Sequence, residues 1–179
     1  GYATRLYPLT ENQPKPLLQI GPKKIADFLL DRIAEIDTVN GVYVVTNQKF
    51  HSHFEKWADK INKSSLYPQF DVVVVNDKTL SNETRLGAIA DIQYVLEQEK
   101  IDDEIVILAG DNIFNINFVE IHNFYKEKNA ASILVHPLAD KSRLTSVGIV
   151  EIDENNKITG FEEKPDIPKS NLIAPPVYF

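Results

Sequence analysis

Short runs of β-branched residues alternate with amphipathic stretches along almost the whole chain, and this alternation limits the fold more than any other feature. Helical spacing of apolar residues predicts helices at residues 25–36, 50–63, 83–99 and 117–128. Runs rich in valine and isoleucine predict strands at residues 42–46, 70–75, 105–109, 131–135, 147–152 and 158–161. Strands joined through helices pair in parallel by right-handed crossovers, so the pattern predicts a largely parallel sheet with helices on both faces.

The last two predicted strands differ from the others because only a short turn separates them. Residues 153–156 (Asp-Glu-Asn-Asn) are typical of a tight turn, so residues 147–152 and 158–161 should form an antiparallel hairpin added to the sheet. The expected fold class is therefore α/β, with a Rossmann-like, mixed and mostly parallel sheet. A length of 179 residues suits one globular domain with a full core, so residues 1–179 are expected to form a single domain.

Both ends of the sequence suggest that the working protein is longer. The chain opens directly with a glycine-containing loop at Gly1, and in an α/β domain such a loop normally follows the first, central strand. Residues 177–179 (Val-Tyr-Phe) have the character of the beginning of a strand. We therefore expect the first strand and a C-terminal portion to lie outside this sequence.

Charge and composition argue against several classes of function. The net charge of −7 disfavours nucleic acid as the main partner, because binding to a phosphate backbone needs a concentrated basic surface. The chain has no cysteine, and its four histidines are too far apart or wrongly spaced for a zinc site. No stretch approaches the roughly 20 apolar residues of a membrane-spanning helix, and no secretory signal pattern opens the chain. A cytoplasmic protein without nucleic-acid or membrane partners is expected, and small phosphorylated substrates remain compatible with the acidic surface.

The N-terminal stretch up to Lys15 concentrates groups suited to phosphate. Gly1 and Ala3 let the backbone approach a ligand closely, and successive N–H groups of such a loop form an anion-binding concavity. Arg5 carries a planar guanidinium that matches phosphate oxygens, and Lys15 is a point charge on a stiff Pro-Lys-Pro segment. Each cation alone is typical of an ordinary surface turn, but the whole constellation favours a phosphate site.

Two further segments place acidic groups at predicted strand ends. Asp111 follows the predicted strand at residues 105–109, and ligands bind at this edge of an open α/β sheet. A carboxylate there can hold Mg²⁺, although an aspartate at a strand end is more often a turn cap when taken alone. Glu163 and Lys164 follow the last predicted strand, where acids and a lysine are also typical of an ordinary charged strand end.

Together these segments resemble the motifs of the sugar-1-phosphate nucleotidylyltransferase family, which includes glucose-1-phosphate thymidylyltransferase and UTP-glucose-1-phosphate uridylyltransferase. Residues 1–10 (GYATRLYPLT) with the following Pro-Lys-Pro are similar to the signature G-x-G-T-R-L-x-P-x-T…K-P, with Ala3 in place of the second glycine. Residues 108–112 (LAGDN) and 160–165 (GFEEKP) resemble the family's metal-binding and sugar-binding segments, in the same order and at family-like spacing.

The resemblance implies roles for individual residues. Those implied in nucleotide binding are Gly1, Tyr2, Ala3, Thr4, Arg5, Lys15 and Gly87. Those implied in binding the sugar phosphate are Asn112, Gly148, Glu163 and Lys164. The implied catalytic residues are Arg5 on the departing phosphates, Lys15 near the α-phosphate and Asp111. Asp111 would hold the Mg²⁺ cofactor, with a second metal-binding aspartate expected beyond residue 179.

The reaction that the resemblance implies is transfer of NMP from an NTP (dTTP, UTP or CTP) to a sugar 1-phosphate, with glucose 1-phosphate as the expected acceptor. Two departures leave the substrates open. Residues 85–89 (RLGAI) differ from the D-G-L-A-Q of many members that prefer dTTP, and Ser146 stands where many members carry an aromatic ring. Full-length members usually form dimers or tetramers, so a homo-oligomer is also expected.

Three other functions fit parts of the pattern. A phosphocholine or polyol-phosphate cytidylyltransferase would share the phosphate loop and differ in its acceptor. A non-catalytic regulatory homologue would keep the fold, but such subunits usually lose the loop arginine, the lysine or the metal-binding aspartate, and Arg5, Lys15 and Asp111 are all present. A glycosyltransferase of similar architecture would need an Asp-x-Asp motif, whereas Asn112 and Ile113 follow Asp111 here.

Overall fold

The computed structural model describes residues 6–179 and divides them into two compact units. Unit 1 contains residues 6–103 and 110–120, and unit 2 contains residues 104–109 and 121–179. The chain therefore passes between the units more than once, and the expectation of a single domain stays a prediction. No helix in this part of the chain is both long and apolar enough to cross a bilayer.

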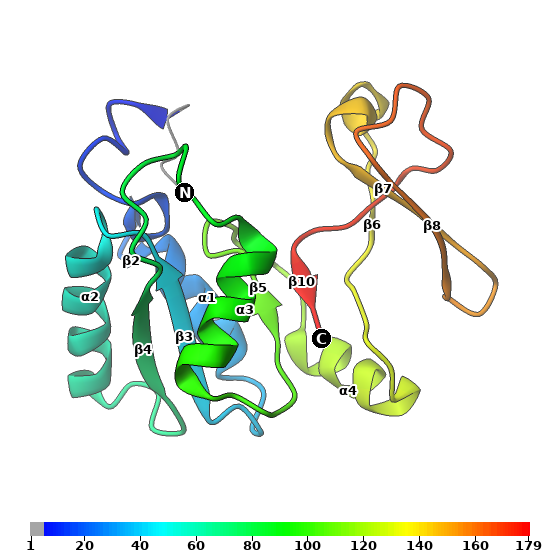
Figure 1. Ribbon diagram of the computed structural model, residues 1–179. Coiled ribbons are helices and arrows are strands. Elements are labelled where there is room, and N and C mark those ends of the chain that lie inside the picture. Colours follow the sequence, from blue (N-terminus) through cyan, green and yellow to red (C-terminus); the bar gives the residue numbers. More distant parts are fainter. Residues whose placement is uncertain (1–5) are drawn as a thin grey trace. The chain divides into compact units, whose positions relative to one another are not determined.

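A parallel pair of strands forms the centre of unit 1 (Figure 1). Strands β3 (Gly41–Thr46) and β4 (Asp71–Asn76) pair in register along their whole length. Helix α2 (His51–Ser64) connects them, which gives the strand–helix–strand arrangement expected from the sequence. All three predicted segments are confirmed to within one residue at each end.

Helices cover both faces of this strand pair. Alternate side chains of a strand point to opposite faces, so Val42 and Val72 share the face on which α1 (Ile25–Ile33) and α2 pack. Helix α3 (Ala88–Glu99) contacts β3 and lies across the other face (Figure 1). The buried cluster beneath α1 and α2 consists of Leu17, Ala26, Leu30, Phe50, Phe54, Trp57, Ala58, Tyr67, Phe70 and Val72.

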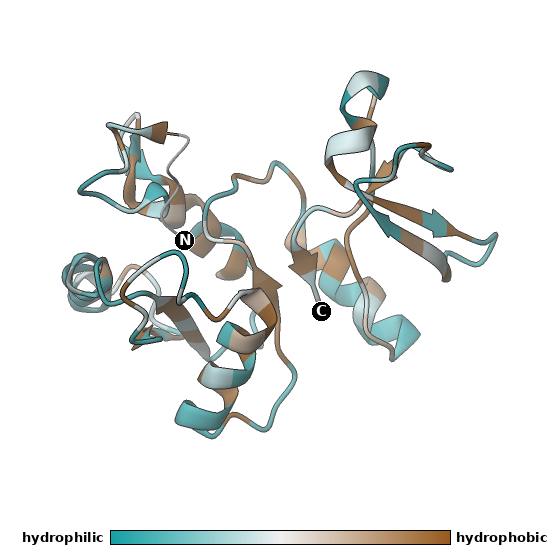
Figure 2. Ribbon diagram, turned by 45° about the horizontal axis from the view of Figure 1, so that its top comes forward, coloured by the Kyte–Doolittle hydropathy of each residue, from teal (hydrophilic) through white to brown (hydrophobic). Residues whose placement is uncertain are grey.

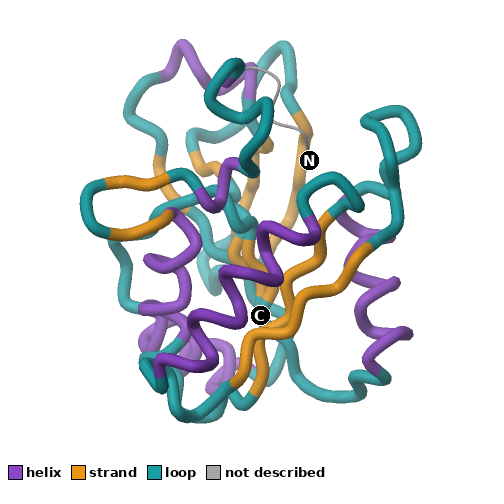
Figure 3. The backbone as a smooth tube through the Cα atoms, turned by 90° about the vertical axis from the view of Figure 1, so that its left-hand side faces the viewer, coloured by secondary structure: helices purple, strands orange, loops and turns teal. Residues whose placement is uncertain are grey.

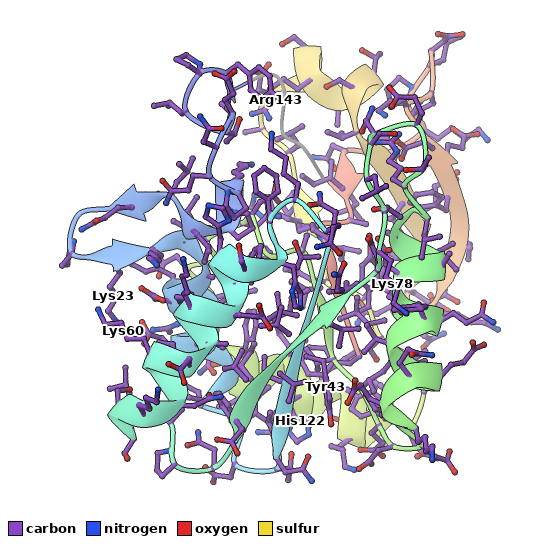
Figure 4. The ribbon with its side chains drawn as sticks, turned by 60° about the vertical axis from the view of Figure 1, so that its left-hand side comes forward. Lys23, Tyr43, Lys60, Lys78, His122 and Arg143 are labelled. Atoms are coloured by element: carbon purple, nitrogen blue, oxygen red, sulfur yellow. The ribbon has the colours of Figure 1, made fainter. Side chains whose placement is uncertain are left out.

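The hydrophobic and hydrophilic surfaces of β3, β4 and α2 also follow the spacing of apolar residues in the sequence. Figure 2 shows that β3 and β4 are largely hydrophobic, whereas α2 carries a hydrophilic face. Lys60 belongs to that exposed face of α2 (Figure 4). Burying a large apolar side chain such as Phe54 or Trp57 contributes about 1.5–3 kcal/mol, so the inner face of α2 is a main source of its stability.

Two carboxylates of α1 tie the helix to aromatic side chains of the core. The Trp57 indole N–H donates to Asp27 Oδ1 at 2.8 Å, and the Tyr67 hydroxyl donates to Asp31 Oδ1 at 2.8 Å. The other Asp31 oxygen pairs with Lys23 Nζ at 2.5 Å. Buried polar groups are thereby satisfied by specific partners, which also fixes how α1 lies against the neighbouring segments.

The Tyr67 pair predicts a loss of stability at alkaline pH. Burial, followed by the hydrogen bond to Asp31, raises the pKa of the Tyr67 hydroxyl above its ordinary value. The unfolded chain then releases this proton first, at about pH 10. The contribution of Tyr67 is therefore fully present below that pH and is lost above it, by up to about 1.4 kcal/mol per pH unit.

Urea unfolding between about pH 8 and about pH 11.5 measures this effect, with Tyr67→Phe as the comparison. The phenylalanine variant is expected to be less stable at neutral pH, because Asp31 loses a donor, and to show a shallower decline above about pH 10. Lysines titrate in both proteins and cancel in the difference. Equal slopes for the two proteins would show that the Tyr67 pKa is not raised.

An antiparallel sheet forms the larger part of unit 2. Its four strands lie in the order β6-β9-β7-β8, and all three pairings are antiparallel. The strands are β6 (His136–Pro137), β7 (Gly148–Ile152), β8 (Ile158–Glu163) and β9 (Leu172–Ile173). The predicted hairpin of β7 and β8 is confirmed, and Asp153 Oδ1 accepts from the N–H groups of Asn155 and Lys157 within its turn.

Two predicted strands are much shorter in the structure. The predicted strand at residues 105–109 is reduced to β5 (Ile107–Leu108), which pairs with β10 (Val177–Tyr178) in antiparallel orientation. The prediction of a strand at residues 131–135 is wrong. That segment makes an isolated bridge between Ile133 and Tyr178, and Ser132 and Phe179 exchange two backbone hydrogen bonds.

Helix boundaries and short elements also differ from the prediction. Helix α3 begins at Ala88 instead of residue 83, because Gly87 has φ +90° and ψ 160°, which no helical turn contains. Helix α1 ends at Ile33, whereas α4 (Phe118–Lys128) matches its prediction to within one residue. The hairpin of β1 (Gln19–Ile20) and β2 (Lys23–Lys24) was not predicted and is visible as a small two-stranded loop in Figure 3. Two 3-10 helices, η2 (Lys15–Leu17) and η3 (Lys141–Ser146), complete the described elements.

Candidate active site

Lys15 opens the short helix η2, whose backbone is stiffened on both sides. Pro14 precedes Lys15 and Pro16 follows it, so the backbone dihedral φ is restricted at both neighbours. The N–H of Leu17 donates to the Pro14 carbonyl at 2.9 Å, and the Leu17 side chain is only 2% exposed. The buried leucine anchors the turn, and Lys15 is thereby presented from a fixed backbone.

Asp111 lies opposite this lysine although 96 positions separate them in the sequence. Lys15 Nζ is 2.8 Å from Asp111 Oδ2, and the amide of Asn112 donates to the other oxygen, Asp111 Oδ1, at 3.0 Å. A Cβ on Gly110 would lie 3.5 Å from the Pro16 ring, so the two segments are in van der Waals contact. The structure thus brings together three predicted site residues in unit 1.

The pair is accessible and therefore easily opened. The side chains of Lys15 and Asp111 are 33% and 42% exposed, and a partly exposed ion pair contributes only about 0–1 kcal/mol to stability. Such a pair has little structural value of its own. Its two members remain available to ligands of opposite charge, phosphate for the lysine and a cation for the carboxylate.

The donor set at Asp111 suits a magnesium ion shared with a substrate. Within residues 6–179 no group of three or more histidine or acidic side chains could cage a metal. Magnesium is commonly held by one or two carboxylates together with phosphate oxygens and water, in place of a cage made only of protein groups. A single accessible carboxylate beside a lysine fits that mode of binding.

Gly87 marks a second predicted site position within unit 1. Its backbone angles fall in a region that only glycine adopts without strain. Among the described residues, no atom beyond Gly87 and its two chain neighbours lies within 4 Å of where its Cβ would be. The Gly87 carbonyl accepts from the Asp91 N–H at 2.9 Å and so starts α3. The backbone of Gly87 at the start of α3 is thus accessible to a ligand. The family resemblance implies that this residue contacts the nucleotide through its main chain.

Replacing Gly87 by alanine should lower the free energy of unfolding by about 1–3 kcal/mol, because a side chain at this φ is strained even though space is available. Urea unfolding would measure the loss. Gly41→Ala is the matched control, since its Cβ would make only an ordinary 3.4 Å contact with Tyr43 on β3, which Figure 4 labels. Equal stabilities of the two variants would contradict the strained geometry at Gly87.

Hydrogen bonds join the loops at the carboxyl ends of β3 and β4. The Asn76 amide donates to Gln48 Oε1 at 2.7 Å, and the Gln48 N–H donates to the Thr79 carbonyl at 3.1 Å. Asp77 Oδ1 accepts from both the N–H and the hydroxyl of Thr79 at 2.7 Å. This edge of the strand pair is therefore held together by side chains, and Lys78 lies in the same loop (Figure 4).

Asp91 on α3 is a feature that sequence reasoning missed. Burial and then the nearby Asp77 raise the pKa of its carboxyl above the ordinary value. Within the part of the chain that the structure describes, its Oδ1 atom is buried without a hydrogen-bond partner. In the sequence, Asp91 is one acid on an otherwise apolar helical face, and only that mismatch could have drawn attention to it.

The residues implied in sugar-phosphate binding gather on the β7–β8 hairpin of unit 2. Gly148 and Glu163 are register partners, and Glu163 Oε2 lies 3.2 Å from where a Cβ on Gly148 would be. Lys164 Nζ is 3.0 Å from Glu163 Oε1, and the Lys164 N–H donates to the Val147 carbonyl at 3.1 Å. The Glu163 carboxylate and the Lys164 ammonium group thus lie side by side at the Gly148 end of the hairpin.

The predicted site residues therefore form two sets, one in each unit. Asp111 contacts both Lys15 and Asn112 in unit 1, which also contains Gly87. The second set, in unit 2, consists of Gly148, Glu163 and Lys164. The phosphate-loop predictions Gly1, Tyr2, Ala3, Thr4 and Arg5 lie outside the described residues.

The accessible cation and carboxylate of this site suit a class of proteins that bind phosphorylated ligands together with a metal. The family model described as nucleotidyl transferase matches residues 1–179, and the chain belongs to this nucleotidyltransferase family. The family and the α/β class expected from the sequence are thus confirmed.

Known relatives extend this assignment. Glucose-1-phosphate adenylyltransferase of Clostridium acetobutylicum is 35% identical over 190 residues, covering 99% of this chain and 48% of the relative. Glucose-1-phosphate adenylyltransferase of Aliivibrio fischeri is 33% identical over 175 residues, covering 94% of this chain and 42% of the relative. The chain thus spans less than half the length of these relatives.

A solved structure shares the fold. It is the crystal structure, in complex with sucrose, of a Bacillus anthracis protein assigned as a glucose-1-phosphate thymidylyltransferase. The match has a TM-score of 0.81 at 21% sequence identity and covers 99% of this chain and 67% of that chain. At this identity the likeness supports the Rossmann-like α/β fold and carries no assignment of substrate.

Proposed function

We propose that this chain carries the catalytic residues of a sugar-1-phosphate nucleotidylyltransferase. The enzyme would transfer NMP from an NTP to a sugar 1-phosphate and release pyrophosphate. The observation that carries the proposal is the accessible pair of Lys15 and Asp111, brought together from distant parts of the chain in a member of the nucleotidyltransferase family.

The reaction joins two anions, so its main difficulty is charge. A phosphate oxygen of the sugar 1-phosphate attacks the α-phosphorus of the NTP, the bond to the β-phosphate breaks, and pyrophosphate leaves. The sugar phosphate is already ionised near neutral pH, so the chain needs no general base. Alignment and neutralisation by fixed cations are the contributions that the protein makes.

Individual residues suit these tasks. Lys15, presented from its rigid turn, would stabilise charge on the α-phosphate, and Arg5 would bind the departing phosphates. Lys164 would hold the phosphate of the acceptor. Asp111 would hold Mg²⁺, which when bound supplies Lewis-acid stabilisation of the phosphate oxygens. Asn112, which already donates to Asp111, would keep that carboxylate oriented.

The sequence-based candidates for the nucleotide are dTTP, UTP and CTP. Because two relatives are named adenylyltransferases, we add ATP to this set. Glucose 1-phosphate is the first acceptor to test, since both of these relatives are named for it.

A pyrophosphate-release assay on the purified protein tests the proposal. Each of ATP, dTTP, UTP and CTP is combined with glucose 1-phosphate, with other sugar 1-phosphates, with phosphocholine and with a polyol phosphate, with and without Mg²⁺. Release that requires both substrates and the metal would support the proposed function. Release only with CTP and phosphocholine or a polyol phosphate would establish the cytidylyltransferase alternative.

Two further outcomes would overturn the proposal. Transfer from a finished nucleotide sugar without pyrophosphate would indicate a glycosyltransferase. Nucleotide-dependent thermal stabilisation without any turnover would indicate a regulatory homologue, because binding to the folded state alone raises apparent stability.

A further inference from the structure

Phe161 on β8 is exposed beside the residues implied in sugar binding. Its side chain is 58% exposed, whereas Val150, its register partner on β7, is fully buried. Single exposed aromatic residues are common on protein surfaces, so exposure alone indicates nothing. The surroundings of the ring are what distinguish this residue.

The Phe161 ring and the Glu163 carboxylate meet above the backbone of Gly148. Two ring atoms lie 3.0 and 3.1 Å, and Glu163 Oε2 lies 3.2 Å, from the position that a Cβ on Gly148 would occupy. Phe161 and Glu163 are two positions apart on one strand, so both side chains project from the same face of the hairpin. The aromatic ring and a carboxylate are therefore adjacent, and both lie over the backbone of Gly148, which has no side chain.

The opposite face of the hairpin has a different character. Lys169 Nζ lies 2.6 Å from Glu162 Oε1 and 4.0 Å from Glu151 Oε1. A Cβ on Gly160 would lie 2.9 Å from Glu151, so that carboxylate lies close over the backbone there. This face carries charged pairs around Lys169, whereas the combination of an aromatic ring with a hydrogen-bond acceptor occurs on the Phe161 face.

We propose that Phe161 is a specificity-determining residue, whose ring supports the apolar face of the sugar ring of the acceptor. This inference rests on the proposed function. A pyranose presents C–H groups on its faces and hydroxyls at its edge, and the electron-rich face of an aromatic ring attracts such C–H groups. Glu163 lies where it can accept hydrogen bonds from hydroxyls at the edge, so their desolvation is compensated.

The charge beside the ring favours a neutral sugar over a quaternary ammonium group. Aromatic rings with a nearby carboxylate can also bind such cations. Here Lys164 Nζ lies 3.0 Å from Glu163, so the carboxylate is already paired with a cation. A neutral sugar hydroxyl can share that carboxylate, whereas phosphocholine would bring its ammonium close to Lys164.

Steady-state kinetics on Phe161→Ala test the assignment. The KM for the sugar 1-phosphate should rise by roughly tenfold, while the KM for the NTP stays within about twofold, because only the acceptor contacts the ring. Phe161→Tyr keeps an aromatic face and should restore the KM. Gly148→Ala places a methyl group at the point where the ring lies and should raise the same KM.

Phe124→Ala is the matched control, since Phe124 is also a partly exposed phenylalanine of unit 2, on α4. It should leave both KM values unchanged. Direct binding of glucose 1-phosphate, followed by saturation-transfer NMR, gives a readout that does not depend on turnover. Contacts to ring C–H protons should weaken in Phe161→Ala and persist in Phe161→Tyr.

The outcomes separate this inference from the proposed function. If the parent protein releases no pyrophosphate with any sugar 1-phosphate, the proposed function fails. If the parent turns over but Phe161→Ala keeps its KM for the acceptor, only the assignment of Phe161 is wrong. Turnover of phosphocholine that depends on Phe161 would also overturn it, because the ring would then serve an ammonium group.

Discussion

Replacing Lys15 by alanine should reduce kcat/KM by roughly 30- to 900-fold, the equivalent of about 2–4 kcal/mol of transition-state stabilisation. The lysine is a preorganised cation on a rigid turn, and its proposed task is to balance charge that develops at the α-phosphate. Pyrophosphate release, measured under subsaturating conditions for both substrates, gives the value directly. A variant with full turnover would exclude Lys15 from the reaction.

The stability of the same variant should hardly change, because its ion pair with Asp111 is partly exposed. Lys63→Ala is a suitable control, since Lys63 Nζ forms a comparable exposed pair with Asp59 at 2.6 Å on α2. Both variants should unfold at nearly the parental urea concentration, and only Lys15→Ala should lose activity. A large loss of stability in Lys15→Ala would instead indicate a structural role.

Changing Asp111 to asparagine should raise the free energy of the transition state by about 2–4 kcal/mol and so lower kcat/KM. It should also weaken the binding of a divalent cation in the presence of nucleotide. Asparagine keeps the size of the side chain but removes the negative charge that a hard cation requires. Binding of Mn²⁺, followed by electron paramagnetic resonance, measures the metal affinity without turnover.

Asp59→Asn is the corresponding control, because it removes an exposed carboxylate that also pairs with a lysine. It should leave both metal binding and activity unchanged. Parental Mn²⁺ affinity in Asp111→Asn would show that the metal, if used, is held elsewhere in the protein.

Local spacing predicted the strand–helix–strand centre of unit 1 well. In α2, Phe54, Trp57 and Ala58 recur at helical spacing and are all buried, so the apolar period and the packing agree. The turn at Asp153 was equally predictable, because the aspartate side chain accepts hydrogen bonds from the backbone N–H groups that define the turn.

Elements whose existence depends on a distant partner were not predictable in this way. The segment at residues 131–135 has strand-forming residues but makes only an isolated bridge from Ile133 to Tyr178. The start of α3 depends on the backbone angles of Gly87, which composition does not reveal. Intrinsic strand preference is weak compared with such tertiary constraints.

For the candidate site, too, the sequence identified individual residues, whereas the contacts between them are known only from the structure. Motif resemblance named Lys15 and Asp111 separately, and only the structure shows that Lys15 Nζ and Asp111 Oδ2 are 2.8 Å apart. Phe161 was part of a quoted motif but was not singled out, because its significance lies in a diagonal contact with Gly148 across two strands. Such contacts depend on register and side-chain direction, neither of which a linear motif specifies.

The ion pair of Lys15 and Asp111 has a thermodynamic consequence: the affinity for the metal and the affinity for the nucleotide should depend on each other. A bare cation that binds Asp111 must displace the lysine, and a bare triphosphate that binds Lys15 must leave the aspartate unpaired. A complex of both supplies each side chain with a new counter-ion in one step. Metal and nucleotide should therefore enhance each other's affinity by the same factor, as linkage requires of any two ligands that share a coupling free energy.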